Sequence, residues 1–136
     1  MSLRHTRVQK GFSLVELMIV IVIIGILAAI GIPMYFDNIY KAKRAEGIAS
    51  MGSIRSQIQM YYAENGFFPV EDPKDYVVGA DWNHIKPGEL QGINFSDSSF
   101  FYESRSGLTW EITVDHQTTF LDEDLKLQSD GTIIGN

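Results

Sequence analysis

The sequence predicts an α+β protein in which one long N-terminal α-helix precedes an antiparallel β-sheet. Two observations support this fold class. An apolar run with one charged residue occupies residues 11–36 and passes into an amphipathic pattern that extends to residue 65. After residue 98, short stretches alternate apolar and polar side chains between turn residues, which is typical of half-buried antiparallel strands.

The apolar run, GFSLVELMIVIVIIGILAAIGIPMYF, is long enough to cross a membrane. The 25 residues from Phe12 to Phe36, at about 1.5 Å each, exceed the ~30 Å hydrocarbon core of a bilayer. A cleaved secretory signal is the alternative, because basic residues precede the run. Such signals have apolar regions of roughly 7–15 residues, whereas this run is longer and continues past Pro33. We therefore expect a membrane helix that is not cleaved after the apolar run.

Glu16 is the one charge inside this run and allows two interpretations. Locally, Ser13-x-x-Glu16 matches a capping box, and an acid in the first turn suits the helix dipole. Alternatively, Glu16 meets a cation in an assembly. Cleavage between Gly11 and Phe12 would create an α-amino group, with a pKa near ~7.7–8.0, one turn from Glu16. In a bundle of helices that amine would neutralise Glu16 of a neighbouring subunit and so set the axial register.

The segment KGFSLVEL at residues 10–17, followed by the apolar run and Gly31-Ile32-Pro33, resembles the class III signal and N-terminal helix of type IV pilins and of type II secretion pseudopilins. The resemblance covers residues 5–69 well and the remainder loosely. It implies the pilin fold, cleavage between Gly11 and Phe12, N-methylation of Phe12, and polymerisation into a helical filament with Phe12 and Glu16 in the assembly contact. It implies no cofactor.

The resemblance also implies partners and a location. The basic residues on the two sides of the run are Arg4, Arg7 and Lys10 before it, and Lys41, Lys43 and Arg44 after it. These nearly balance under the positive-inside rule, so the resemblance decides that the N-terminus is cytoplasmic. The chain is then single-pass in the bacterial cytoplasmic membrane before assembly and extracellular in a pilus afterwards. Its expected partners are a prepilin peptidase and methylase, a platform protein, an assembly ATPase and further copies of itself.

Gly31 and Pro33 are expected to kink or loosen the helix, because Pro removes a backbone donor and clashes one turn back. A harmless membrane-helix proline is the alternative. Beyond Pro33 the apolar side chains recur at spacings of three or four: Ile48, Met51, Ile54, Ile58, Tyr61 and Tyr62. Asn65-Gly66 is a stop signal.

The helix from Phe12 to Asn65 would then contain 54 residues and extend roughly 80 Å. The 71 residues that follow are too few to bury such a rod. One half must therefore be covered by lipid or by other copies of the chain, which is an argument for polymerisation independent of any resemblance.

The chain divides into five predicted segments. They are a leader at 1–11 cleaved after Gly11, a transmembrane and filament-core half-helix at 12–36, an amphipathic half-helix at 37–65, a connecting loop region at 66–97 and the sheet of a globular head at 98–136. Strand signals lie at 100–102, at 108–114 with Leu108, Trp110, Ile112 and Val114 facing inward, more weakly at 118–121 and 125–128, and at 132–134. About three or four strands are expected to pack on the second half of the helix.

Composition and motifs exclude several other functions. The net charge is −6 and falls to −9 when the leader, with three basic residues and no acid, is removed. This acidity argues against direct nucleic-acid binding. Phosphate-loop, dinucleotide and hydrolase motifs are absent, so we expect a protein that is not an enzyme.

No metal site is expected either. The acidic residues Asp122, Glu123, Asp124 and Asp130 offer oxygen ligands for calcium, but their spacing does not match an EF-hand and a solvated turn is favoured. His5, His84 and His116 are scattered singly. Trp82, His84 and Phe95 are expected to pack rather than to bind a ligand.

The sequence has no cysteine, whereas many pilins close a C-terminal loop with a disulfide. The apolar helix–sheet interface must therefore hold the head together. A type IV pilin is the favoured interpretation, because the calcium loop of major pseudopilins is missing. A pseudopilin of a short periplasmic filament and a membrane-anchored binding module that never polymerises stay open. The sequence does not separate motility, adhesion, DNA uptake and electron transfer.

Overall fold

The computed structural model describes residues 11–116, 121 and 123–135. The chain divides into two units, Met1–Asn38 and Ile39–Asn136, which we describe separately. Most of the predicted leader, the acidic residue Asp122 and most of the weak strand expected at 118–121 lie outside the described residues.

Helix α1, Leu14–Asn65, is the long N-terminal helix that the sequence predicts. Its C-terminal end is set by local chemistry. The side-chain amide of Asn65 donates to the carbonyl oxygen of Tyr61 at 2.9 Å, and Gly66 follows with a φ of 80°, a conformation that glycine adopts without a steric penalty. The predicted stop at Asn65-Gly66 is therefore confirmed.

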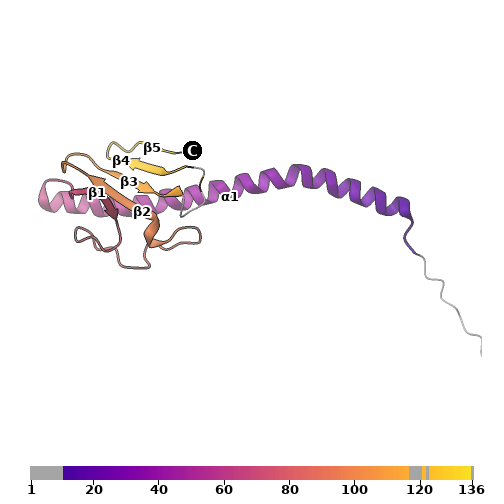
Figure 1. Cartoon of the computed structure of the whole chain (residues 1–136), viewed down its shortest axis with the longest axis horizontal. Helices are drawn as coiled ribbons and strands as arrows, with labels where there is room; N and C mark the ends of the chain where they lie inside the picture. Colours follow the sequence, from indigo (N-terminus) through magenta and orange to yellow (C-terminus); the bar gives the residue numbers. More distant parts are fainter. Residues whose placement is uncertain (1–10, 117–120, 122, 136) are drawn as a thin grey trace, which may run out of the picture. The chain divides into compact units, whose positions relative to one another are not determined.

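The second unit contains a five-stranded sheet in the order β1-β2-β3-β4-β5 (Figure 1). Each strand pairs antiparallel with the next one along the chain. The strands are β1 (Glu71–Tyr76), β2 (Phe100–Ser104), β3 (Glu111–Val114), β4 (Leu125–Gln128) and β5 (Ile133–Ile134), and a short 3-10 helix, η1 (Asp97–Ser99), leads into β2. The α+β architecture is confirmed, and the sheet has five strands where about three or four were expected.

Strand β1 lies inside the region expected to be a connecting loop. Its sequence, EDPKDY, shows no alternation of apolar and polar residues, and most of its side chains are exposed. Pro73 is compatible with this strand because β1 is at the edge of the sheet, where one side of the strand needs no ladder hydrogen bonds. The pairing with β2 is interrupted between Glu71 and Asp75.

Strand β3 is shorter than the predicted strand at 108–114. Trp110, Ile112 and Val114 are buried as expected, but Leu108 is 77% exposed because it belongs to the turn between β2 and β3. Thr113, expected to face solvent, is also buried. It has a neighbouring strand on each side, since it pairs with both β2 and β4.

The core of the second unit lies between the amphipathic half of α1 and the sheet. Met51, Ile54 and Ile58 on the helix are completely buried, as the spacing of apolar residues predicts. The buried side chains that the sheet contributes to this core are those of Phe100, Tyr102, Ile112, Val114, Leu125 and Leu127. Trp82 and Phe95 are also buried in this cluster, which confirms that they are packing residues.

Candidate functional site

The first half of α1 exposes an apolar surface. Its large apolar side chains between Phe12 and Phe36 retain 45–78% of their surface, and an 18-residue window of the helix has a mean hydropathy of 2.9. Each Å² of such surface left in water costs about 25 cal/mol. By length and composition this half-helix can cross a membrane, and its surface requires a cover of lipid or protein.

The N-terminal end of α1 is closed by Ser13 and Glu16. The Ser13 backbone N–H donates to Oε2 of Glu16 at 2.8 Å, and the Glu16 backbone N–H donates to the Ser13 hydroxyl oxygen at 3.2 Å. This is the reciprocal capping box that the sequence predicts. The local interpretation of Glu16 is therefore correct for the single chain.

The capping box leaves Glu16 available for a second contact. The carboxylate accepts the Ser13 backbone N–H through Oε2. The side chain is exposed on the helix surface. Capping within one subunit and ion pairing with another are thus compatible, although the pairing stays a prediction.

The predicted cleavage junction, Gly11 and Phe12, is exposed and precedes the first helical residue. A Cβ atom added at Gly11 would meet no atom within 4 Å. The fold of the single chain therefore gives no reason for glycine at this position, and a requirement for glycine would have to come from a processing enzyme.

Gly31 and Pro33 lie within α1, which is assigned as helix without interruption through both residues. A Cβ atom at Gly31 would also meet nothing within 4 Å. The predicted kink or loosening at these residues stays a prediction.

In the second unit, Glu46 of α1 binds a loop that sequence reasoning did not connect to it. Its Oε1 accepts the Asn94 backbone N–H at 3.1 Å and its Oε2 accepts the Asn94 side-chain amide at 2.6 Å. Burial raises the pKa of Glu46, but these hydrogen bonds outweigh burial and leave the pKa below its usual value. A Cβ atom at Gly92 would collide with this carboxylate.

We expect Glu46→Ala to lower the free energy of unfolding by about 2 kcal/mol at neutral pH, because hydrogen bonds to a charged acceptor are lost. A carboxylate whose pKa is depressed by folding stabilises the fold above its unfolded pKa, near ~4.3, and loses that effect as pH falls through the folded pKa. The variant should therefore lose less stability on acidification than the unaltered chain. Denaturant titration followed by tryptophan fluorescence measures both effects. Glu64→Ala, an exposed position on the same helix, is the control, and equal losses in the two variants would contradict the assignment.

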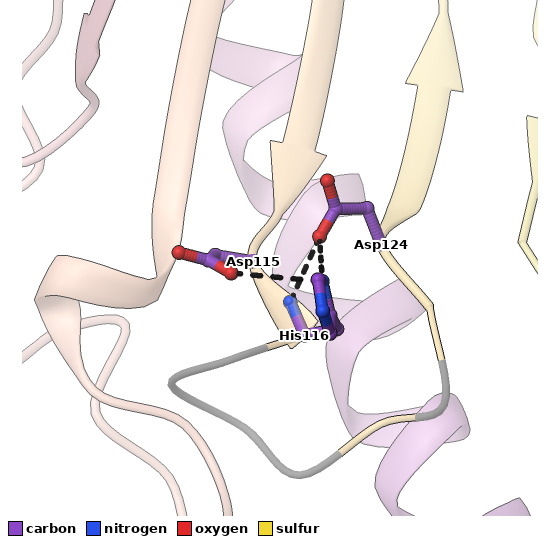
Figure 2. A group of neighbouring side chains, drawn as sticks. All are labelled: Asp115, His116 and Asp124. Atoms are coloured by element: carbon purple, nitrogen blue, oxygen red, sulfur yellow. Dashed lines mark hydrogen bonds and ion pairs between the residues drawn. The ribbon is translucent and has the colours of Figure 1, made fainter.

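A second group that the sequence did not reveal is formed by Asp115, His116 and Asp124 (Figure 2). Asp115 and His116 directly follow β3, and Asp124 directly precedes β4. Because Val114 pairs with Leu125, these segments lie at the same end of the two strands. The signal in the sequence was an Asp-His pair after one strand and an aspartate before the next, but it required the strand register.

His116 is bound to Asp124 through two atoms. Its backbone N–H donates to Oδ1 of Asp124 at 3.0 Å, and its Nδ1 lies 2.6 Å from the same oxygen. Nδ1 is 3.9 Å from Oδ1 of Asp115. Burial raises the pKa of Asp124, but the contacts with His116 outweigh it and hold the pKa below its usual value.

The acidic cluster considered for calcium is not assembled by the described residues. The carboxylate of Asp130 instead accepts the Thr132 backbone N–H at 2.8 Å in the turn between β4 and β5. His84 is exposed, so the expectation that it packs with Trp82 and Phe95 is wrong.

Comparisons with known proteins agree with this N-terminal element. Residues 6–32 match the family model for the prokaryotic N-terminal methylation motif. The chain is 46% identical over 91 residues to fimbrial protein EcpB of Eikenella corrodens, covering 67% of this chain and 55% of that protein. It is 44% identical over 105 residues to the type IV major pilin protein PilE1 of Neisseria gonorrhoeae, covering 76% of this chain and 48% of that protein.

The chain therefore spans about half the length of the curated relatives that it matches. No solved structure matches it significantly. The methylation motif, the long apolar helix and the identity to fimbrial proteins and type IV major pilins support membership of the type IV pilin family.

Proposed function

We propose that this chain is the structural subunit of a type IV pilus and polymerises through the first half of α1. The observation that carries the proposal is an exposed apolar half-helix whose one charge is Glu16. Such a surface is covered by lipid before assembly and by neighbouring helices afterwards. The relatives named as fimbrial proteins and major pilins support this function.

In this proposal, residues 1–11 are a leader that a prepilin peptidase removes after Gly11, and Phe12 becomes the methylated N-terminus. The new amine of one subunit pairs with the exposed carboxylate of Glu16 of the next. Residues 12–36 form the filament core, and Gly31 and Pro33 allow the helix to loosen there. Residues 37–65 form the amphipathic half-helix on which the head packs. The connecting region is 66–97, and 98–136 form the sheet of the head.

The proposed role is structural rather than catalytic. Before assembly the subunit lies in the cytoplasmic membrane with its N-terminus in the cytoplasm. A platform protein and an assembly ATPase then move it into an extracellular filament. The net charge of −6 gives no reason to propose a direct nucleic-acid partner.

We expect protein sheared from the cell surface to consist of long filaments whose subunit begins at methylated Phe12. Electron microscopy of the sheared fraction, with mass spectrometry and N-terminal sequencing of the same sample, measures both properties. A processed subunit found only in the cell envelope would favour a pseudopilin. A subunit that retains residues 1–11 would contradict the processing step and leave a membrane-anchored module.

A further inference from the structure

We propose that Asp115, His116 and Asp124 form a binding site for a divalent transition-metal ion, with Zn²⁺ as the simplest occupant. Each residue offers one ligand atom, and these atoms all lie within 4.8 Å of one another. Imidazole nitrogen and carboxylate oxygen are ordinary zinc ligands. The site is independent of the apolar half-helix, so it goes beyond the proposed filament role.

The distances require only small side-chain movements to admit an ion. Ligands at about 2.0–2.2 Å from a tetrahedral zinc are roughly 3.3 Å from one another. Nδ1 of His116 now lies 2.6 Å from Oδ1 of Asp124 and 3.9 Å from Oδ1 of Asp115. Figure 2 shows the two carboxylates on either side of His116. A bound ion requires Asp124 to move slightly away from the ring and Asp115 to move slightly toward it.

The donor set favours a transition metal over calcium. Calcium takes six to eight oxygen ligands, whereas this group supplies one nitrogen and two carboxylates. The side chains of His116, Asp115 and Asp124 are 40%, 30% and 35% exposed. Water can therefore complete the coordination of the ion. The positive charge of Lys74 also acts on Asp124, which opposes a cation and predicts moderate rather than very tight binding.

A bound ion would join the end of β3 to the start of β4. The chain has no cysteine, so no disulfide closes the connection between these strands. An ion that binds the folded head and not the unfolded chain stabilises the folded state by mass action. The expected consequence of binding is therefore a more stable head.

The test titrates ZnSO₄ into the full chain, purified in detergent without a polyhistidine tag, by isothermal calorimetry at neutral pH. We expect one Zn²⁺ per chain and a rise of about 10 °C in the unfolding midpoint of the head at a hundredfold excess over the dissociation constant. His116→Ala should remove binding. Asp115→Asn, which keeps the shape of the side chain, should weaken it at least about tenfold.

Two matched controls decide whether the binding is specific. His84→Ala and His5→Ala remove the other imidazoles and should bind Zn²⁺ as the unaltered chain does. The proposal is overturned if Zn²⁺ does not bind, or if His116→Ala and Asp115→Asn bind it normally. It is also overturned if equimolar Ca²⁺ displaces Zn²⁺. None of these results depends on whether filaments form.

Discussion

Replacing Glu16 by glutamine is expected to abolish filaments while leaving the chain inserted in the membrane. Glutamine still accepts the Ser13 N–H in a capping box, so the variant removes the charge and keeps the cap. An α-amino group left unpaired in the apolar core of a filament would cost about 3–5 kcal/mol at each contact, a weakening of hundredfold or more. The apolar surface that drives membrane insertion is unchanged.

Ser13→Ala is the matched control for Glu16→Gln. It removes the hydroxyl that accepts the Glu16 N–H and keeps the carboxylate, so it should weaken the helix start by about 1 kcal/mol and still give filaments. Electron microscopy and immunoblots of sheared and membrane fractions measure assembly and insertion separately. Filaments from Glu16→Gln together with none from Ser13→Ala would mean that capping is the whole role of Glu16.

The long helix was predictable because its signals are local. The capping box at Ser13 and Glu16, the spacing of Met51, Ile54 and Ile58, and the stop at Gly66 each act within a few residues. The methylation motif is equally local, since residues 6–32 contain all of it. The same holds for the strands with strong alternation, and Trp110, Ile112 and Val114 are buried as their spacing predicts.

Strand β1 could not be predicted because its own residues do not favour a strand. Its sequence, EDPKDY, is acidic and contains proline, and it is extended because β2 offers backbone hydrogen bonds at the edge of the sheet. Tertiary context therefore determines this element. Leu108 is the opposite case, since it continues an apolar alternation but is exposed in a turn.

The two polar groups of the head were missed for the same physical reason. Glu46 and Asn94 are 48 residues apart, and nothing near either residue indicates the other. His116 meets Asp124 only because β3 and β4 pair in a particular register. Contacts of this kind depend on how elements are packed, and a single sequence does not report packing.

We expect Ile58→Ala to lower the free energy of unfolding of the head by about 2–5 kcal/mol. Ile58 is completely buried between α1 and the sheet, so truncation removes apolar contacts and leaves a cavity. Alanine is a better helix former than isoleucine, so the loss cannot come from weakening the helix. For a domain stabilised by about 5–15 kcal/mol, this is a large part of the total.

Met60→Ala is the control for Ile58→Ala, because Met60 is two residues away on the same helix and is 50% exposed. It should change the stability by much less than 1 kcal/mol. Urea unfolding of the full chain in detergent, followed by fluorescence, reports on the head alone, since both tryptophans, Trp82 and Trp110, are buried there. Similar small losses in the two variants would contradict the expectation that the helix–sheet interface stabilises the cysteine-free head.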